Sequence, residues 1–492
     1  MLKQILLFLI LIFLTRNTNK YSLMDIFKFN NKIAAIQDDG TTITYKELED
    51  FSRQAGHIIG ERCLAFILCR NTIGSLASYL ACLDNKIVPL LLDSSLDKEL
   101  YINLQKTYKP QYIFMPADLT NEDNHVTFEK YHYTIIKTNF DKKYSLNNNL
   151  ALLLNTSGST GSSKVVRLSC ENIRANAESI VQYLELNDSE RPITTLPMHY
   201  SYGLSIINSH LMVGATILLT SKSLMQKEFW NFFKTEGATS FGGVPYTYEI
   251  LNKLRFVRMD LPSLRSMTQA GGKLSLELHK HFAQYASEKR KRFFVMYGQT
   301  EATARMAYLP YEKSLEKCGS MGMAIPGGEL TLIDADGKEI VEPDVMGELV
   351  YRGLNVTLGY AECGTDLAKG NERHGVLVTG DMAKRDTDGF YYIVDRKKRF
   401  LKIFGNRVNL DETEWMIKSA FPDLNCACAG TDDNMYIFLT NKEMAPEVRA
   451  YISEKTKLNP SAFKTVVIDN IPKNEAGKTL YVKLAKYYYG LQ

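Results

Sequence analysis

Several signatures of specialised proteins are missing from this chain of 492 residues. It has no C-x-x-C pair that would indicate a zinc site, and its eight cysteines are too few for a disulfide framework in so long a chain. The net charge of +4 is too small to indicate nucleic-acid binding. No internal repeat of short period and no low-complexity tract is present. These absences favour a globular cytoplasmic protein with reduced thiols and no nucleic-acid partner.

An apolar run long enough to span a bilayer is also missing. Residues 5–14 are apolar throughout, but a membrane-spanning helix needs about 20 such residues. The basic start at Lys3 fits a signal peptide, yet no small-residue cleavage site follows. Two interpretations stay open for residues 1–23: a short segment that contacts membranes, or sequence upstream of the true start at Met24. We favour the second, because domain-like sequence begins directly after Met24.

The length of the chain and its alternation of strand and helix patterns predict two or more domains. A single core does not extend over 492 residues. Short apolar runs that suit buried strands alternate with helical patterns, which favours an α/β sandwich with mostly parallel sheets. Residues 339–359 read as antiparallel strands, so we expect the large domain to end in a small β unit. The expected strands are residues 64–69, 87–92, 215–219 and 240–244, and the expected helices are residues 73–83, 224–235 and 246–256.

Residues 152–169 carry the strongest local signal. A β-type run gives way to eight small, flexible residues, 156–163, before Lys164 and another β-branched pair. A loop of glycine and hydroxyl residues between two strands can direct backbone N–H groups at an anion, and the lysine adds a charge suited to phosphate. It is not a Walker loop, because G-x-x-x-x-G-K-[ST] cannot be laid over it. We expect a phosphate-binding loop, although a flexible surface hairpin has a similar composition.

This loop resembles the phosphate loop of the adenylate-forming, acyl-activating superfamily. That superfamily comprises acyl- and aryl-CoA synthetases, luciferases and the adenylation domains of non-ribosomal peptide synthetases. The sequence departs from the family pattern at Ser163, where proline usually precedes the lysine. Four further motifs extend the resemblance over nearly the whole chain. The resemblance implies ATP binding by Thr156, Ser157, Gly158, Ser159, Thr160, Gly161 and Lys164.

The hexapeptide MYGQTE, which ends at Glu301, resembles the family's aromatic-Gly-x-Thr-Glu motif. Activation of ATP needs a carboxylate to hold Mg²⁺ and hydroxyls near the phosphates. The resemblance therefore makes Glu301 the magnesium ligand and Thr300 a phosphate contact. Tyr297 is expected to stack on adenine, with Gly298 and Gln299 in the same ATP-binding motif. Without the other motifs, the hexapeptide would be an ordinary turn with a solvated glutamate.

Two more motifs are expected beside the nucleotide. The glycines of QAGGK let the backbone approach a flat base closely, and the resemblance makes this segment an adenine wall. The strand-like LVTGD ends in Asp381, and the matching aspartate in the family takes both ribose hydroxyls. Arg396 is expected to join it. Each motif alone would be a simple turn. The adenine wall consists of Ala270, Gly271 and Gly272.

A domain boundary is expected in the charged run DRKKRFLK, between a strand-like segment and a new α+β pattern. The resemblance implies that a small C-terminal domain rotates about one residue of this run, Lys398. The expected domains are therefore residues 24–397, which bind AMP, and residues 398–492, which form a lid.

The small domain is expected to supply two further lysines. Lys402 and Gly405 lie where the family lets the acceptor thiol approach. Lys478 matches the lysine that reaches the adenylation site and steadies the charge between the carboxylate and the α-phosphate. A cation at that point lowers the barrier, because an anionic nucleophile attacks an anion. Tyr481 stands where the family often has arginine, so contacts beyond Lys478 stay open.

The acyl pocket is less readable. LPMHYSYGL resembles the pocket element of acyl- and aryl-CoA synthetases, with His199 and Tyr200 near its gate and Tyr202 in a wall. Amino-acid-activating relatives usually place an aspartate in this region, and residues 192–214 contain none. An α-amino acid substrate is therefore disfavoured. Arg305 adds a charge near the expected end of the acyl group, and between an ion pair and a substrate contact we favour the ion pair.

The sequence thus predicts an α/β fold with a large N-terminal domain of stacked α/β sheets plus a small β unit. A small, mobile α+β C-terminal domain follows. The resemblance implies an AMP-forming ligase that uses ATP and Mg²⁺ to convert a carboxylic acid into an acyl-adenylate. The acyl group then passes to the thiol of CoA or of a carrier protein's phosphopantetheine. A stand-alone adenylation enzyme for an amino or hydroxy acid, or a non-catalytic binding homologue, remains the alternative.

Overall fold

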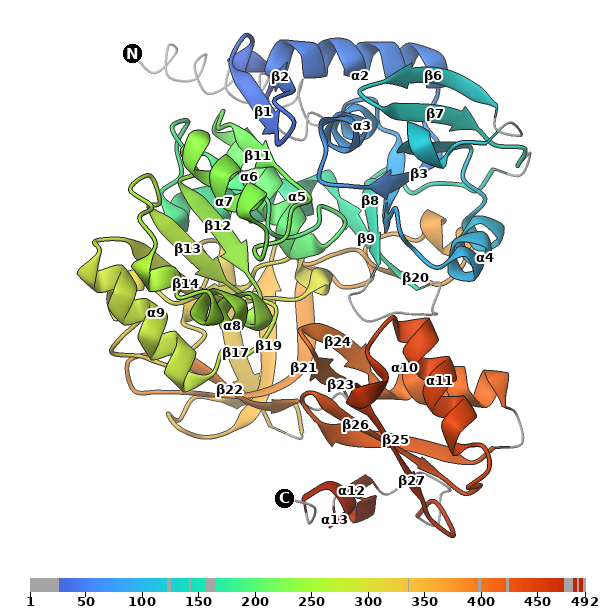
Figure 1. Ribbon diagram of the computed structural model, residues 1–492, viewed down its shortest axis with the longest axis vertical. Helices are drawn as coiled ribbons and strands as arrows, with labels where there is room; N and C mark the ends of the chain where they lie inside the picture. Colours follow the sequence, from blue (N-terminus) through green and yellow to red (C-terminus); the bar gives the residue numbers. More distant parts are fainter. Residues whose placement is uncertain are drawn as a thin grey trace, which may run out of the picture.

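The computed structural model describes residues 26–121, 125–140, 143–155, 164–334, 336–396, 400–421, 424–472, 481–484 and 486–489. It has the predicted α/β architecture, with a large N-terminal domain of three sheets and a small C-terminal domain (Figure 1). The small domain lies against one end of the large one.

A nine-stranded sheet forms one layer of the large domain, in the order β16-β15-β14-β13-β12-β10-β11-β1-β2. Its central strands are parallel, so their carboxyl ends reach the same edge of the sheet. The strands are β1 (Ile33–Gln37), β2 (Thr42–Thr44), β10 (Pro192–Ile193), β11 (Ile217–Leu219), β12 (Ser240–Gly243), β13 (Ser266–Gln269), β14 (Arg292–Tyr297), β15 (Ala307–Tyr308) and β16 (Met323–Ala324).

An eight-stranded sheet forms the second layer, in the order β20-β9-β8-β4-β3-β5-β7-β6. The predicted strand–helix–strand unit is confirmed, because β3 and β4 are parallel neighbours joined by a helix. All six side chains of β3 are buried, which explains its uninterrupted apolar sequence. The strands are β3 (Leu64–Cys69), β4 (Val88–Asp93), β5 (Tyr112–Pro116), β6 (Val126–Lys130), β7 (Tyr133–Lys137), β8 (Leu150–Asn155), β9 (Val165–Ser169) and β20 (Gly359–Ala361).

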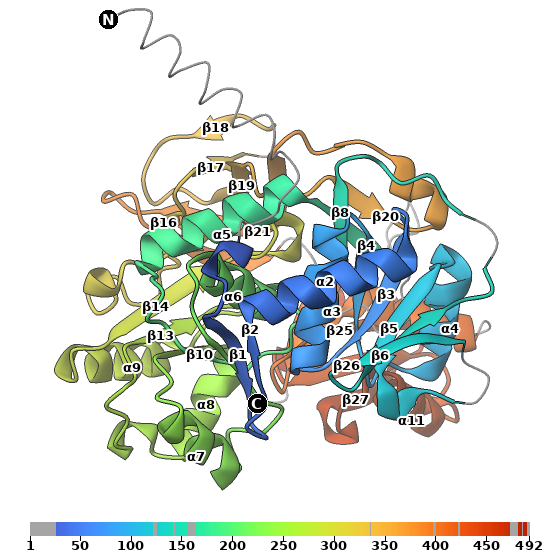
Figure 2. The same ribbon diagram turned by 90° about the horizontal axis from the view of Figure 1, so that it is seen from above.

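Helices fill the space between the two layers and cover their outer faces (Figure 2). Helix α2 begins with a capping box, in which Thr44 and Glu47 satisfy each other's backbone N–H groups. Helix α3 is apolar on every side because it lies between the sheets. The helices are α2 (Tyr45–Ile59), α3 (Ile73–Asp84), α4 (Lys98–Tyr108), α5 (Cys170–Leu184), α6 (Ser201–Met212), α7 (Lys227–Thr235), α8 (Pro245–Lys253) and α9 (Leu276–Glu288).

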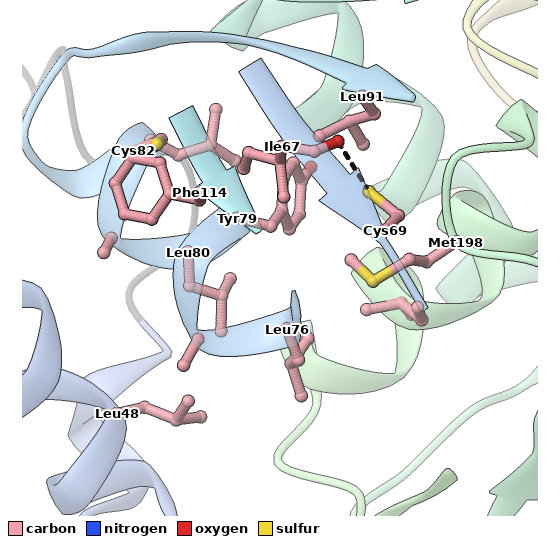
Figure 3. Close-up of a cluster of buried hydrophobic side chains, with 14 of the residues drawn as sticks. Leu48, Ile67, Cys69, Leu76, Tyr79, Leu80, Cys82, Leu91, Phe114 and Met198 are labelled. Atoms are coloured by element: carbon pink, nitrogen blue, oxygen red, sulfur yellow. Dashed lines mark hydrogen bonds between the residues drawn. The ribbon is translucent and has the colours of Figure 1, made fainter. Parts of the chain in front are cut away.

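The core between the layers joins residues of both sheets with those of α3 and α6. Figure 3 shows side chains of α3, among them Leu76, Tyr79 and Leu80, gathered with Leu91 of β4 and with Met198. The buried hydroxyl of Tyr79 donates to Asn208 Oδ1 of α6 at 3.1 Å. This core fixes α6, whose first turn borders the candidate site described below.

The predicted β unit that closes the large domain is a five-stranded antiparallel sheet, in the order β18-β17-β19-β21-β22. The last residue of the expected segment 339–359 lies outside this sheet, because Gly359 begins β20, which pairs antiparallel with β9. The strands are β17 (Gly328–Ile333), β18 (Glu339–Ile340), β19 (Gly347–Gly353), β21 (Val376–Arg385) and β22 (Tyr391–Arg396).

The small domain has hydrophobic cores of its own, which contain only residues from Leu401 onward. Among the described residues, no helix or strand of this domain packs extensively against one of the large domain. Polar contacts join them instead: Lys455 Nζ lies 2.6 Å from Glu99 Oε2, and Lys457 donates to the Ser95 carbonyl. The elements are β23 (Phe400–Ile403), β24 (Asn406–Asn409), α10 (Leu410–Ala420), β25 (Cys426–Thr431), β26 (Asn434–Leu439), α11 (Ala445–Thr456), β27 (Phe463–Val467), α12 (Tyr481–Leu484) and α13 (Lys486–Tyr489).

All eight cysteines lie in the described part of the chain and are free thiols, as the sequence predicted. Over the same residues, no helix combines the length and the apolar character needed to cross a bilayer. The segment 1–23, for which membrane contact was considered, lies outside the described residues.

Candidate active site

A cavity of about 730 Å³ lies between the two domains, at the carboxyl ends of β13 and β14. Open α/β sheets bind their ligands at this edge, because strand ends and the loops after them converge there. Side chains of Ser201 and Tyr297 line the cavity from the large domain, and Leu401 and Lys402 line it from the small domain. The predicted adenine wall, residues 297–300 and the predicted acyl-pocket residues therefore line one cavity.

Strands β8 and β9 lie on either side of the glycine-rich loop, as the sequence predicted, and they pair antiparallel. Lys164 precedes β9 and lies at the edge of the loop. Its Nζ is 3.4 Å from Glu362 Oε1 and 3.9 Å from the ring centroid of Tyr360. The loop itself lies outside the described residues, so the ATP-binding prediction is not tested for Thr156, Ser157, Gly158, Ser159, Thr160 and Gly161.

Glu301 lies in the short helix η4 (Thr300–Ala302), directly after β14. Its Oε1 accepts a hydrogen bond of 2.6 Å from the hydroxyl of Tyr360 on β20. Burial, reinforced by the charge of Glu301, raises the pKa of Tyr360, so this hydroxyl stays protonated and donates. Pairing of β20 with β9 therefore brings Tyr360, Glu301 and Lys164 together.

No group of three or more histidine, cysteine, aspartate or glutamate residues suited to hold a metal occurs within the described residues. A protein cage for a metal is therefore not formed by these side chains. A single carboxylate such as Glu301 is nevertheless a suitable ligand for Mg²⁺ that is also held by substrate phosphates.

Tyr297, Gln299 and Asp381 form one hydrogen-bonded group. Tyr297 donates its hydroxyl to Asp381 Oδ2, and Gln299 Nε2 donates to the same oxygen at 2.9 Å. Asp381 is buried, and the backbone N–H of Asp381 donates to the Thr379 hydroxyl. Strand pairing of β21 and β22 places Arg396 opposite Asp381, and the side chain of Arg396 lies outside the described part. Two motifs far apart in the sequence thus meet here.

Thr300 is buried, and its hydroxyl lies 3.1 Å from that of Ser201, in the first turn of α6. Gly298 fits only as glycine, because an added Cβ would meet the backbone oxygen of Ala304 at 1.6 Å. The segment that begins with Tyr297 is therefore tightly folded against the residues that follow it.

The segment Ala270, Gly271 and Gly272 follows β13 and forms one wall of the cavity. Gly271 has a φ of +78°, which glycine adopts without strain. A Cβ on Gly272 would meet Lys402 Nζ at 2.1 Å, so the ammonium group of the small domain touches this wall. Lys402 is held in turn by its backbone N–H, which donates to Asp432 Oδ1 at 2.8 Å.

The predicted acyl-pocket residues line the same cavity at the start of α6. The rings of Tyr200 and Tyr202 are 6.3 Å apart and nearly perpendicular, and the hydroxyl of Tyr202 lies 2.8 Å from that of Thr268. Burial lowers the pKa of His199, although Asp93 lies 3.9 Å from its Nε2, so the imidazole stays neutral at pH 7. This wall is therefore largely aromatic and uncharged.

Two predicted catalytic residues, Lys398 and Lys478, lie outside the described residues. Sequence reasoning also missed Tyr360, since nothing in its local sequence marks it and only the pairing of β9 with β20 brings it to Glu301. The ion pair expected for Arg305 is not formed among the described residues; its guanidinium contacts neutral groups, which are described below.

Comparisons with known proteins identify the family of this chain. The family model for the AMP-binding enzyme matches residues 26–361. Oxalate–CoA ligase of Arabidopsis thaliana is 29% identical over 353 residues, covering 67% of this chain and 65% of that protein. 2-Succinylbenzoate–CoA ligase of Bacillus subtilis is 25% identical over 478 residues, covering 91% of this chain and 94% of that protein. With oxalate–CoA ligase and three other plant proteins, the alignments span only 61% to 65% of the relative's length.

A solved structure shares the fold over both domains. It is a double mutant of o-succinylbenzoate CoA synthetase from Bacillus subtilis, bound with its product analogue. The TM-score is 0.78 with 23% sequence identity, over 94% of this chain and 98% of that one. Together with the family match, which spans more than half of the sequence, the comparisons show that this chain belongs to the AMP-binding enzyme family.

Proposed function

We propose that this protein is an AMP-forming acid–thiol ligase that uses ATP to activate a carboxylic acid and then transfers the acyl group to CoA. One observation carries the proposal: the interdomain cavity is lined by Tyr297 and Gln299, which donate to Asp381, by Thr300, the neighbour of Glu301, and by Lys402 of the small domain. In the first half-reaction, a carboxylate oxygen attacks the α-phosphorus of ATP and pyrophosphate leaves. In the second, a thiolate attacks the acyl carbon and AMP leaves.

The residues present fit a nucleotide. Asp381 offers a buried carboxylate whose neighbours Tyr297 and Gln299 already orient it, which suits the two ribose hydroxyls. The glycine wall that ends at Gly272 allows a flat base to approach the backbone. Glu301 would hold Mg²⁺, which neutralises phosphate charge when bound. Lys164 and the loop before it are assigned to the phosphates.

The second half-reaction is assigned to the domain arrangement seen here. Contact of Lys402 with the glycine wall at Gly272 supports an approach of the acceptor thiol along this interface. We propose domains of residues 24–397 and 398–492, with Lys398 as the pivot. Rotation about Lys398 would exchange Lys402 for Lys478 at the cavity, so that Lys478 stabilises the charge that develops during adenylation.

CoA is the proposed acceptor because the relatives that match are named CoA ligases. One structural neighbour is an adenylation domain artificially fused to a carrier-protein domain, and a carrier's phosphopantetheine is the second candidate acceptor. The requirement for ATP favours the cytoplasm as its location. An amino-acid substrate is disfavoured, because the cavity wall at α6 presents neutral aromatic groups.

The proposal is tested by screening carboxylic, amino and hydroxy acids for ATP-dependent pyrophosphate release, first without a thiol and then with CoA. We expect release with at least one carboxylic acid and, on adding CoA, the corresponding thioester by mass spectrometry. The variant Glu301→Gln should retain the fold and lose most of this activity, because a neutral amide is a poor ligand for Mg²⁺. Nucleotide binding without release for any acid would favour the non-catalytic homologue.

A further inference from the structure

Arg305 is a buried charge without a counter-ion among the described residues. Arg305 is only 2% exposed to solvent, and the guanidinium of an arginine stays protonated in proteins. Nε donates to the Ser205 hydroxyl at 3.2 Å, and Nη1 donates to the Tyr183 hydroxyl at 2.9 Å and to Met296 Sδ at 3.2 Å. All of these partners are uncharged. Nη2 has no hydrogen-bond partner in the described part of the chain.

The other buried arginine of the large domain shows how the same protein satisfies a guanidinium. The side chain of Arg167 is fully buried, forms an ion pair with Glu372 and donates to the carbonyls of Tyr360 and Gly370. Its role is structural, because these partners join β9 to the segment that follows β20. Among the described residues, no carboxylate and no backbone carbonyl accepts a hydrogen bond from the guanidinium of Arg305. Burying a charge without such partners is costly, so a ligand that completes the site is the simpler explanation.

The titratable groups around Arg305 do not supply the missing negative charge. Burial raises the pKa of Tyr183 and of Tyr202, so both phenols stay neutral even though Arg305 opposes the shift. His210 is also neutral, since burial lowers its pKa to about 4 and Arg305 contributes to the lowering. The ring of Tyr202, 5.0 Å from the guanidinium carbon, offers only a cation–π contact. The local charge is therefore positive.

Arg305 also lines the interdomain cavity, together with Ser201 and Tyr202 at the start of α6. It follows Thr300 and Glu301, which are assigned to the phosphates and to Mg²⁺, by only a few residues. A small acid held in this cavity can therefore present its reacting carboxylate to the nucleotide and its other end to Arg305.

We propose that the acid activated by this enzyme carries a second anionic group, a carboxylate, which binds Arg305 inside the cavity. This inference rests on the proposed function and specifies its substrate class. A carboxylate at Arg305 accepts hydrogen bonds from Nη2 and supplies the absent counter-charge. A monocarboxylic acid of the same length leaves the guanidinium uncompensated. Arg305 is thus a specificity-determining residue.

The test compares matched pairs of acids with the full-length enzyme. Succinate, glutarate, adipate, pimelate, suberate and phthalate are each assayed beside the monocarboxylate of the same skeleton, by ATP-dependent pyrophosphate release. Hydrogen bonds to charged groups predict about a 10- to 100-fold higher kcat/KM for the best dicarboxylate than for its partner. The half-amide of that dicarboxylate should lose most of the advantage. A monocarboxylate that matches or exceeds its partner in every pair, or an equally good half-amide, overturns the proposal.

Variants of Arg305 test whether this residue causes the preference for a dicarboxylate. Arg305→Met should bring the ratio of kcat/KM for the dicarboxylate to that for the monocarboxylate down to about one, whereas Arg305→Lys should keep part of the preference. The matched control is Arg174→Met, an exposed arginine on α5 beside Glu178, which should leave the preference unchanged. An unchanged preference in Arg305→Met contradicts the assignment. If that variant does not fold, Arg305→Lys and the wild-type comparison still decide.

A binding measurement separates this inference from the proposed function. Thermal unfolding of the wild-type enzyme is followed with AMP and each acid, because a ligand stabilises the folded state whether or not it reacts. A higher Tm with a dicarboxylate than with its monocarboxylate supports the site at Arg305, even if no acid releases pyrophosphate and the proposed function fails. Equal Tm values for all pairs overturn the inference, even if monocarboxylates are activated.

Discussion

Gly272→Ala tests whether the contact between the glycine wall and Lys402 belongs to the thioester-forming step. The backbone of Gly272 lies outside the left-handed region, so alanine fits its conformation. The new Cβ would nevertheless meet Lys402 Nζ at 2.1 Å and Pro245 Cγ at 3.0 Å. Because an ordinary Cβ contact begins at 3.4 Å, Nζ must retreat by about 1.3 Å.

The expected magnitude follows from that displacement. The lysine side chain is flexible, so the fold should be retained and the ammonium group should move away from the cavity wall. A misplacement of about 1 Å in a positioned group can lower a rate by about 100-fold. We expect transfer from a preformed acyl-adenylate to CoA to fall by about 10- to 100-fold, with a smaller change in pyrophosphate release. Gly370→Ala is the control, since its Cβ would meet only Asn147 Nδ2 at 4.0 Å.

A double-mutant cycle with Lys402→Ala decides the cause. If the new methyl group acts by displacing the ammonium group, Gly272→Ala adds nothing once that group has been removed. Single-turnover thioester formation is therefore measured for both single variants and for the double variant. An equal further loss in the Lys402→Ala background would refute the reasoning, because the methyl group would then act on the bound nucleotide.

Three other predictions use different properties of the chain. Tyr360→Phe removes the hydrogen bond to Glu301, and the Mg²⁺ concentration for half-maximal pyrophosphate release should rise by about 10-fold; an unchanged titration contradicts this role. Burial lowers the pKa of His279 from 6.5 to about 4, and its Nδ1 accepts the N–H of Gly319. The unfolded chain therefore binds the proton first, and urea unfolding should show stability falling below pH 6.5, by about 2 kcal/mol near pH 5. His279→Gln should weaken this dependence. Lys478→Ala should nearly abolish pyrophosphate release but spare transfer from supplied acyl-adenylate; equal losses in both assays contradict its assignment.

The sequence predicts the architecture well where burial is uniform. Residues 64–69 coincide with β3, because a strand covered on both faces is apolar at every position. The segment expected as a helix from residue 224 instead starts at Lys227 in α7, because the residues before it form a turn in which the N–H of Gln226 donates to the Ser223 carbonyl. Helix boundaries depend on such local contacts more than on periodicity.

The sequence predicts only those residues of the candidate site that belong to a recognisable motif. MYGQTE and LVTGD point to Tyr297 and Asp381, and the fold joins them by a hydrogen bond. Tyr360 has no local signal, because its role depends on the pairing of β20 with β9. For Arg305, the sequence shows a charge but not whether a carboxylate lies opposite it. That question depends on the packing of α5 and α6, which periodicity does not specify.

If the small domain rotates as we propose, the sparse contact between the two domains determines what controls that rotation. An exposed ion pair such as Lys455 with Glu99 contributes at most about 1 kcal/mol, and no shared hydrophobic core adds to it. The polypeptide itself would therefore set only a weak bias between the two proposed orientations of the small domain. A ligand that favours one orientation by a few kcal/mol is enough to reverse the population. The order in which ATP, acid and thiol occupy the cavity would then give the proposed rotation its direction.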